Sequence, residues 1–150
     1  MQFKPYMRLA ATASMLALGG LVLAQPAAAQ DAPKKIEKIG LMVQDMSNPF
    51  FSAMTKGAEE AAKAIGASVN TQDAQLDLAN QNTQIDAFIQ QGVNLIVISA
   101  VDEAGIEPAI LRAKEAGIIV IAVDTPAKGP DAVIMTNAVQ AGERSCDYLF

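Results

Sequence analysis

Three glycines recur at nearly equal intervals in the middle of the chain, at Gly66, Gly92 and Gly117. The intervals are 26 and 25 residues, about the length of one helix, one strand and two short connections. Each glycine follows an amphipathic run and precedes a strand-like run, and glycine ends a helix in the left-handed conformation at little cost. The spacing therefore predicts a succession of β-α units.

Two of the apolar runs, Leu95–Ile98 and 118–121, contain no polar residue. Strands that are apolar throughout are typical of a parallel sheet with helices on both faces. We therefore predict an α/β fold built on a doubly wound parallel sheet. The expected strands are 36–43, 67–72, 93–99, 118–123 and 133–136. The expected helices are 49–65, 77–91 and 104–116, and a further helix is expected to contain Phe150.

Each of the three complete helices shows an apolar stripe at three- and four-residue steps, which predicts the face that packs on the sheet. In helix 49–65 the predicted face is Phe50, Met54, Gly57, Ala58, Ala61 and Ile65. In helix 77–91 it is Leu78, Ile85, Phe88 and Ile89, with Asn80, Gln81, Gln84 and Asp86 directed elsewhere. In helix 104–116 it is Ile106, Ile110 and Ala113, with Asp102 as the N-cap and Pro108 in the first turn.

Residues 1–29 have the pattern of a secretory signal peptide. Lys4 and Arg8 supply the positive charge, and the uncharged, mostly apolar segment 9–24 is shorter than the roughly 20 residues that span a membrane. The three alanines at 27–29 provide the small residues of a cleavage site. We expect export and cleavage near Ala29, which leaves 30–150 as one domain. An N-terminal membrane anchor is the alternative, and no second apolar segment favours it.

The composition excludes several kinds of function. The chain has no histidine, which removes the commonest general base and the commonest metal ligand. The carboxylates are scattered, so we predict no metal site, no cofactor and no catalysis. Without the signal segment, 9 basic residues face 16 acidic ones, a net charge of about −7, which argues against nucleic acid or an anionic membrane as partner. Cys146 is the only cysteine and is expected to be a small buried residue.

The loops after the predicted strands carry no glycine motif for a dinucleotide or a phosphate. They carry amide, carboxylate and aromatic residues instead, at the strand ends where doubly wound sheets bind ligands. Ser47-Asn48-Pro49-Phe50-Phe51 follows the first strand, with Asn48 as N-cap and Pro49 as first helical residue. The candidate ligand-binding residues are Asn48, Phe50, Phe51, Asp124, Asn137, Asp45 and Thr125.

Each candidate also has a structural interpretation that the sequence leaves open. Phe50 and Phe51 point about 100 degrees apart on a helix, so one of them can be a core residue. Asp124 can stabilise its own loop through an Asx-turn, and Asp45 and Asn137 are turn residues by type. We favour ligand contact for Asp124, because it follows a strand that is expected to be buried.

With these motifs in place, the chain resembles the N-terminal half of a periplasmic sugar-binding protein of the ribose-binding type. The resemblance rests on the signal peptide, Asn48-Pro49-Phe50-Phe51, Asp73-Ala74-Gln75, Val123-Asp124 and Thr136-Asn137. It implies that Asn48 binds sugar hydroxyls, that Phe50 and Phe51 pack on the C–H face of the sugar, and that Asp124 accepts from two hydroxyls. Thr125 stands where this type often has arginine, and Asn137-Ala138 where it often has Asp-Asn, which argues against ribose itself.

The resemblance further implies the soluble receptor of an ABC importer, which captures a monosaccharide or polyol between two lobes and delivers it to a permease in the inner membrane. Such a protein is periplasmic, monomeric when complete, free of cofactors and not an enzyme, and a chemoreceptor is a further possible partner. We expect this chain to be a truncated first lobe that binds weakly alone. The alternatives are an exported α/β enzyme and the core of a sugar-responsive transcriptional regulator, which would begin with a basic helix-turn-helix.

Overall fold

A computed structural model describes residues 35–149, so the predicted signal segment 1–29 and Phe150 lie outside the described residues. The strands are β1 (Lys38–Val43), β2 (Ser68–Asp73), β3 (Leu95–Ile98), β4 (Ile119–Val123) and β5 (Ala132–Ile134). The helices are α1 (Pro49–Ala64), α2 (Leu78–Gln91), α3 (Glu107–Glu115) and α4 (Ala138–Leu149). In this part of the chain, strands and helices alternate from β1 to β4 as the glycine spacing predicts, and β5 then follows β4 without a helix between them.

The five strands form one sheet in the order β2-β1-β3-β4-β5, and every pairing is parallel. In β1, Ile39 pairs with Val69 on one side and with Leu95 on the other, so the chain winds first toward one edge and then toward the opposite edge. The predicted doubly wound parallel sheet is confirmed. The strand order reverses between β1 and β3, which is where such a sheet leaves a crevice at its carboxyl ends.

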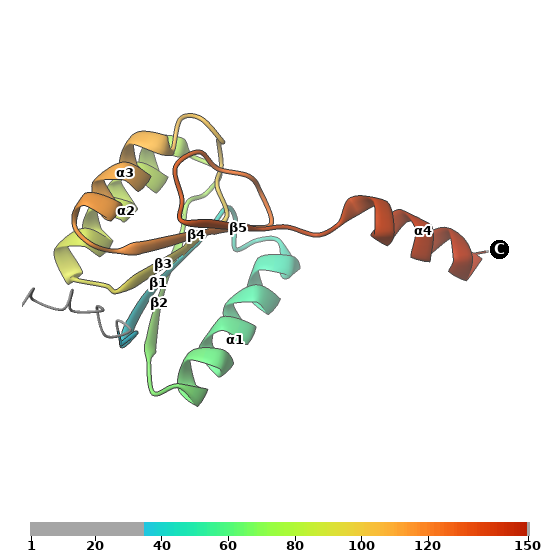
Figure 1. The fold of residues 1–150 in the computed structure, drawn as a ribbon, viewed down its shortest axis with the longest axis horizontal. Coiled ribbons are helices and arrows are strands. Elements are labelled where there is room, and N and C mark those ends of the chain that lie inside the picture. Colours follow the sequence, from blue (N-terminus) through green and yellow to red (C-terminus); the bar gives the residue numbers. More distant parts are fainter. Residues whose placement is uncertain (1–34, 150) are drawn as a thin grey trace, which may run out of the picture. The chain divides into compact units, whose positions relative to one another are not determined.

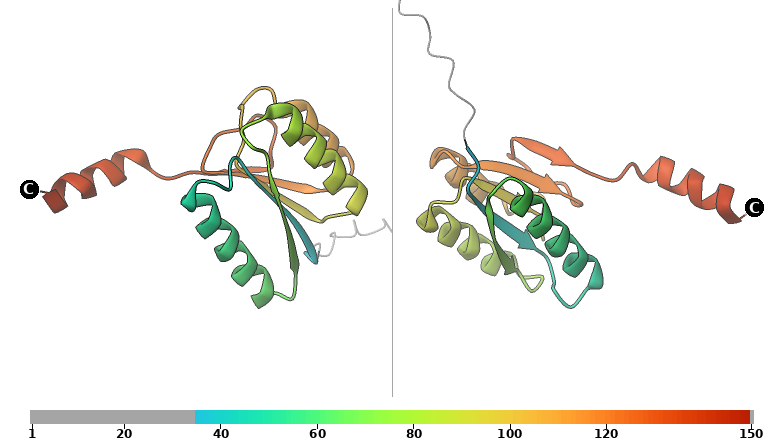
Figure 2. Two further views of the ribbon diagram at one scale, coloured as in Figure 1. Left: turned by 180° about the vertical axis from the view of Figure 1, so that it is seen from behind. Right: turned by 90° about the horizontal axis from the view of Figure 1, so that it is seen from below.

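Helices lie on both faces of the sheet (Figures 1 and 2). The α2 and α3 helices cover one face, where Ile85, Phe88 and Ile110 are fully buried against strand residues such as Ile96 and Val120. The α1 helix covers the opposite face over β1 and β2. There the packed residues are Leu41, Val43 and Phe51, with Met54, Ala58, Val69 and Val97 partly buried around them.

Helix α2 packs closely on the central strand because β1 has a glycine under it. A Cβ added to Gly40 would lie 2.6 Å from Cδ2 and 2.8 Å from Cγ of Phe88. Phe88 itself is fully buried, as predicted. The phenylalanine ring therefore occupies the space that a side chain at position 40 would fill.

Side chains cap the first turns of α1 and α2, and the cap of α1 is the predicted one. Asn48 caps α1 by accepting from the Phe50 N–H, and Asp77 caps α2 by accepting from the Asn80 N–H. The three periodic glycines all have the left-handed backbone, with φ of 73° at Gly66, 65° at Gly92 and 76° at Gly117. Glycine adopts this conformation without steric penalty, which explains the regular spacing of these residues in the sequence.

One predicted cap is wrong. Helix α3 begins at Glu107, and its N-cap position, Ile106, makes no side-chain hydrogen bond. Asp102 instead stabilises the preceding turn, where its Oδ1 accepts from the Ala104 and Gly105 N–H groups. The acidic residue and the helix start are separated by one extra turn of chain, which periodicity alone does not reveal.

The inward face of α1 also differs from the prediction. Phe51 and Ala62 are the buried residues of this helix, whereas Phe50 is 49 % exposed and Ile65 is 61 % exposed. Met54 and Ala58 of the predicted face do pack there, but Phe51 and Ala62 are buried in place of the predicted Phe50 and Ala61, because α1 presents Phe51 to Leu41 and Val43. In α2 the predicted stripe is confirmed, but Gln81, expected to point elsewhere, is fully buried.

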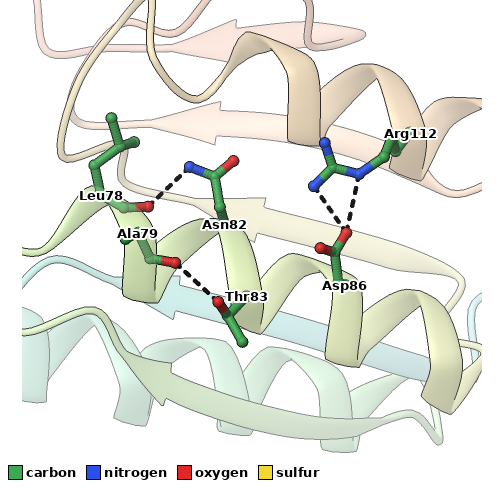
Figure 3. A network of polar contacts seen from close by, with 6 residues as sticks. All are labelled: Leu78, Ala79, Asn82, Thr83, Asp86 and Arg112. Carbon is green, nitrogen blue, oxygen red and sulfur yellow. Dashed lines mark hydrogen bonds and ion pairs between the residues drawn. The ribbon is translucent and has the colours of Figure 1, made fainter.

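Helices α2 and α3 are joined at their outer surface by an ion pair, shown in Figure 3. Oδ1 of Asp86 accepts from Nε of Arg112 at 3.0 Å and from Nη2 at 2.9 Å. On α2 the same figure shows Asn82 and Thr83, whose side chains donate back to the carbonyls of Leu78 and Ala79. Both ion-pair partners are about half exposed, so the pair contributes little to the free energy of unfolding.

The last two elements, β5 and α4, are exposed along their whole described length. Helix α4 covers neither face of the sheet (Figures 1 and 2). Cys146 is therefore exposed, and the expectation that it is buried is wrong. On the α1 side of the sheet, Val97, Ile121 and Val123 are only half buried, since no described helix lies over β3 and β4.

Candidate functional site

Three loops meet at the carboxyl ends of β1, β3 and β4, beside the point where the strand order reverses. Nε2 of Gln44, after β1, donates to the Ala100 carbonyl at 2.6 Å and to Oγ1 of Thr125 at 3.3 Å. Oγ1 of Thr125, after β4, donates to the same carbonyl at 3.0 Å and lies 3.3 Å from Oγ of Ser99. These bonds bring segments more than 80 residues apart in sequence into direct contact.

The loop after β1 uses Asp45 for its own structure. The Asp45 carboxylate accepts from Oγ of Ser47 at 2.7 Å and from the Ser47 N–H at 2.8 Å. The hydroxyl bond and then the backbone bond hold the pKa of Asp45 below its usual range. Asp45 is therefore an ionised turn residue at neutral pH, and a direct ligand contact for it stays a prediction.

Asn48 and Phe50 are the groups of this loop that remain available. Oδ1 of Asn48 accepts from the Phe50 N–H at 3.0 Å, which leaves the amide Nδ2 without a partner among residues 35–149. Both Asn48 and Phe50 are exposed. An amide donor thus lies two residues before a half-exposed aromatic ring, which is the combination that the sequence predicts for this loop.

The two adjacent phenylalanines have different environments. Their ring centroids are 5.2 Å apart and the ring planes cross at 75°, an edge-to-face pair. Phe51 is 4 % exposed and packs with Leu41 and Val43, whereas half of Phe50 is exposed. The ring of Phe50 is the one that can cover a ligand, and Phe51 supports it from the core.

Asp124 has an unusual backbone at the end of β4. Its φ is +67°, and the Thr125 N–H donates to the Val123 carbonyl at 2.7 Å across it, which makes a three-residue γ-turn. The side chain is exposed and forms no hydrogen bond or ion pair within the described residues, so the alternative of an Asx-turn finds no support. Its carboxylate is free to accept bonds from a ligand.

Asn137 caps the last helix of the described chain. Its Oδ1 accepts from the Gln140 N–H at 3.1 Å, which caps α4. It follows β5, the edge strand beyond β4, and its bond is the one expected of a turn residue. A ligand role for Asn137 stays a prediction.

The loop after β2 joins the same edge of the sheet. Gln75 and Leu76 both have positive φ, 55° and 57°, and Oδ1 of Asp73 accepts from the Gln75 N–H. The Leu76 N–H then donates to the Gln44 carbonyl at 2.8 Å. The Asp-Ala-Gln motif of the sequence thus fixes the neighbouring loop, and Leu76, 61 % exposed, adds apolar surface there.

Sequence reasoning missed Gln81 and Gln44. Gln81 is fully buried, its Nε2 donates to the Ser99 carbonyl at 3.0 Å, and its Oε1 accepts from the Val101 N–H at 3.0 Å. It thereby fixes the loop after β3. Its position between Leu78 and Ile85 at helical spacing is a signal that could have identified it. Gln44 directly follows the apolar strand β1, which is the corresponding signal there.

We predict that Gln81→Leu lowers the free energy of unfolding by about 2–3 kcal/mol, because the carbonyl of the buried Ser99 and the N–H of the partly buried Val101 lose their partner. Urea denaturation followed by circular dichroism measures the change. Gln90→Leu is the matched control, since Gln90 is an exposed glutamine of the same helix. Equal stability of the two variants would show that Gln81 has no such role.

The surface has two hollows, one of them bordered by Gln75 of the loop after β2. One, of about 430 Å³, is lined by Gln75, Asp77, Ala79, Asn80 and Thr83. The other, of about 510 Å³, is lined by Asp86, Ile89, Gln90, Arg112 and Glu115. Both are shallow and neither contains Phe50 or Asp124. The candidate site is therefore an open surface at the strand ends.

Residues 35–149 contain no group of three or more acidic or cysteine side chains arranged to hold a metal ion. Within the same range, no helix has the length and apolar character needed to cross a membrane.

A doubly wound parallel sheet, with an amide, an aromatic ring and a free carboxylate at the switch point, has the architecture of a ligand-binding lobe. Residues 39–150 match the family described as periplasmic binding protein domain. The chain belongs to this family.

Curated relatives agree with the resemblance found in the sequence. The ribose import binding protein RbsB of Bacillus subtilis (strain 168) is 33 % identical over 118 residues, which cover 77 % of this chain and 39 % of the relative. The xylitol-binding protein of Mycolicibacterium smegmatis is 31 % identical over 115 residues, 75 % of this chain and 33 % of the relative. The predicted relation to ribose-type periplasmic binding proteins is confirmed. The chain spans less than half the length of these relatives.

Solved structures have the same fold. An ABC transporter solute-binding protein from Mycobacterium smegmatis with bound glycerol is 35 % identical, with a TM-score of 0.59, and the match covers 63 % of this chain and 33 % of that protein. The Caulobacter myo-inositol-binding protein, bound to myo-inositol, is 26 % identical with a TM-score of 0.64, and the match covers 79 % of this chain and 40 % of that protein.

Proposed function

We propose that the whole protein is the periplasmic solute-binding protein of an ABC importer and captures a monosaccharide or polyol. The observation that carries the proposal is the exposed, unpartnered carboxylate of Asp124 in a loop hydrogen-bonded to the loop of Asn48 and Phe50. A sugar or polyol has hydroxyl groups for carboxylate and amide, and C–H groups that an aromatic ring can cover. The names of the relatives, which refer to ribose, xylitol, glycerol and myo-inositol, support this ligand class.

The mechanism follows from the position of the site at an open surface. A ligand held by Asn48, Phe50 and Asp124 would be covered on one side only, so a second lobe would complete the contacts. Closure of two lobes over the ligand stabilises the closed form, because only that form makes both sets of contacts. An inner-membrane permease would recognise the closed form, and export through the predicted signal peptide would place the protein in the periplasm. We further propose a monomer without cofactor or catalytic activity.

We predict that the full protein binds at least one of D-ribose, xylitol, myo-inositol and glycerol in isothermal titration calorimetry. Asp124→Ala should raise the Kd by about 100-fold or more, because hydrogen bonds to a charged group are stronger than neutral ones. Phe50→Ala should weaken binding in the same assay. Asp147→Ala is the matched control and should bind as the unaltered protein does, since Asp147 is an exposed carboxylate of α4.

Two results would overturn the proposed function. One is binding confined to amino acids or nucleotides when these are added to the panel. The other is turnover of a sugar or polyol by the purified protein, which would favour the alternative of an exported α/β enzyme.

A further inference from the structure

Asp124 has a backbone conformation that its residue type does not explain. A φ of +67° lies in the region that non-glycine residues rarely adopt, and a γ-turn with positive φ is strained. Such a conformation persists only where the surrounding structure holds it in place. The contacts around Asp124 therefore identify the residues that maintain it.

The backbone on both sides of Asp124 is held by hydrogen bonds. The Asp124 N–H donates to the Ile134 carbonyl of β5 at 3.0 Å, and the Thr125 N–H donates to the Val123 carbonyl. The Thr125 hydroxyl anchors the turn on the other side, since it donates to the Ala100 carbonyl at 3.0 Å. The turn is thus attached to both neighbouring strand ends.

The Thr125 hydroxyl has no bonding capacity left for a ligand. A hydroxyl has one donor and two acceptor positions. Its proton goes to Ala100, and its oxygen lies 3.3 Å from both Nε2 of Gln44 and Oγ of Ser99. Gln44 also donates to the Ala100 carbonyl. The sequence-based expectation that Thr125 contacts the ligand therefore does not fit its environment.

We propose that Thr125 and Gln44 are positioning residues, whose shared hydrogen bonds with the Ala100 carbonyl hold Asp124 in its γ-turn and present its carboxylate to the ligand. The role of the carboxylate rests on the proposed function, whereas the role of Thr125 and Gln44 in the turn does not. The same bonds connect the Asp124 turn to the loop that carries Asn48 and Phe50. One network thus sets the geometry of both parts of the site.

Two substitutions at position 125 test the proposal in the full protein. Thr125→Val keeps the shape and removes the hydroxyl, and Thr125→Ser keeps the hydroxyl and removes a methyl group. Amide hydrogen exchange measured by NMR should rise about tenfold at Asp124 and Thr125 in Thr125→Val, the factor expected for one lost hydrogen bond. Exchange in β1 and β3 should stay unchanged, and Thr125→Ser should restore slow exchange.

The same variants are titrated with D-ribose, xylitol, myo-inositol and glycerol. Thr125→Val should raise the Kd of the bound compound by about tenfold, and Thr125→Ser should restore it. If none of the four binds the unaltered protein, the binding prediction for these compounds fails, and the exchange rates still decide whether the network holds the turn. Gln44→Glu keeps the size and removes the donor. If Thr125→Val does not fold, Gln44→Glu takes its place in the test and should show the same rise in exchange and in Kd.

The proposal is overturned if exchange at Asp124 stays slow in Thr125→Val, or if it rises evenly across the sheet. It is also overturned if Thr125→Ser behaves as Thr125→Val does, because the hydroxyl would then not be the active group. A loss of affinity without a local change in exchange would place Thr125 among the ligand contacts instead.

Discussion

Replacing Gly40 by valine should lower the free energy of unfolding by about 3 kcal/mol, at the upper end of the range for overpacked cores. The new Cβ would lie within 2.6 to 2.8 Å of three ring atoms of Phe88, and neither group can move away. Gly40 belongs to the central strand β1, and the ring of Phe88 is fully buried under α2. Urea denaturation measured by circular dichroism gives the change.

Two further variants separate this clash from a general effect of losing glycine. Gly57→Ala, on the exposed side of α1 where an added Cβ meets nothing within 4 Å, should stabilise the protein by up to about 1 kcal/mol. Phe88→Leu, introduced together with Gly40→Val, should recover part of the stability that Gly40→Val loses, because the smaller side chain frees space over the strand. A stable Gly40→Val protein with an unshifted midpoint would contradict the packing described for β1 and α2.

Phe51→Ala should destabilise the protein by about 3–5 kcal/mol, the range for phenylalanine replaced in a core. Phe51 is the buried ring of α1, and it packs with Leu41 and Val43 of the central strand β1. The same denaturation experiment measures the effect.

Phe50→Ala is the matched control, because it removes an identical ring one position earlier. Its ring is half exposed, so the stability should change by less than about 1 kcal/mol, while ligand binding should weaken as proposed above. The pair of variants thus separates a structural ring from a binding ring. If Phe50→Ala were the more destabilising of the two, the assignment of the α1 face would be wrong.

Local signals in the sequence were sufficient for the framework of the fold. The glycines that end α1, α2 and α3 mark the units, because a left-handed residue is needed at each of these positions and glycine adopts it most easily. The predicted cap Asn48 is confirmed for a similar reason, since its side chain accepts from an N–H only two residues away. Continuous apolar strands indicated the parallel sheet, and the motifs at its strand ends indicated the family.

Interactions between distant segments could not be predicted in this way. The ring that α1 buries is Phe51 and not the expected Phe50. Both residues fit an apolar stripe, and only contact with Leu41 and Val43 selects Phe51. Gln81 was expected outside the core because glutamine is polar. It is buried because the Ser99 carbonyl and the Val101 N–H, about 20 residues further along the chain, satisfy both ends of its amide.

The sequence by itself therefore determined the order of strands and helices and the residue types at the strand ends where we propose the binding site, since these depend on near neighbours along the chain. Only the tertiary structure decided what each of these residues does. Thr125 bonds to Ala100 and Gln44, and Asp124 extends an unpartnered carboxylate, although the two are adjacent and both polar. The reason is physical: hydrogen-bonding capacity is used by whichever group lies within reach, and that is settled when the sheet brings the three loops together.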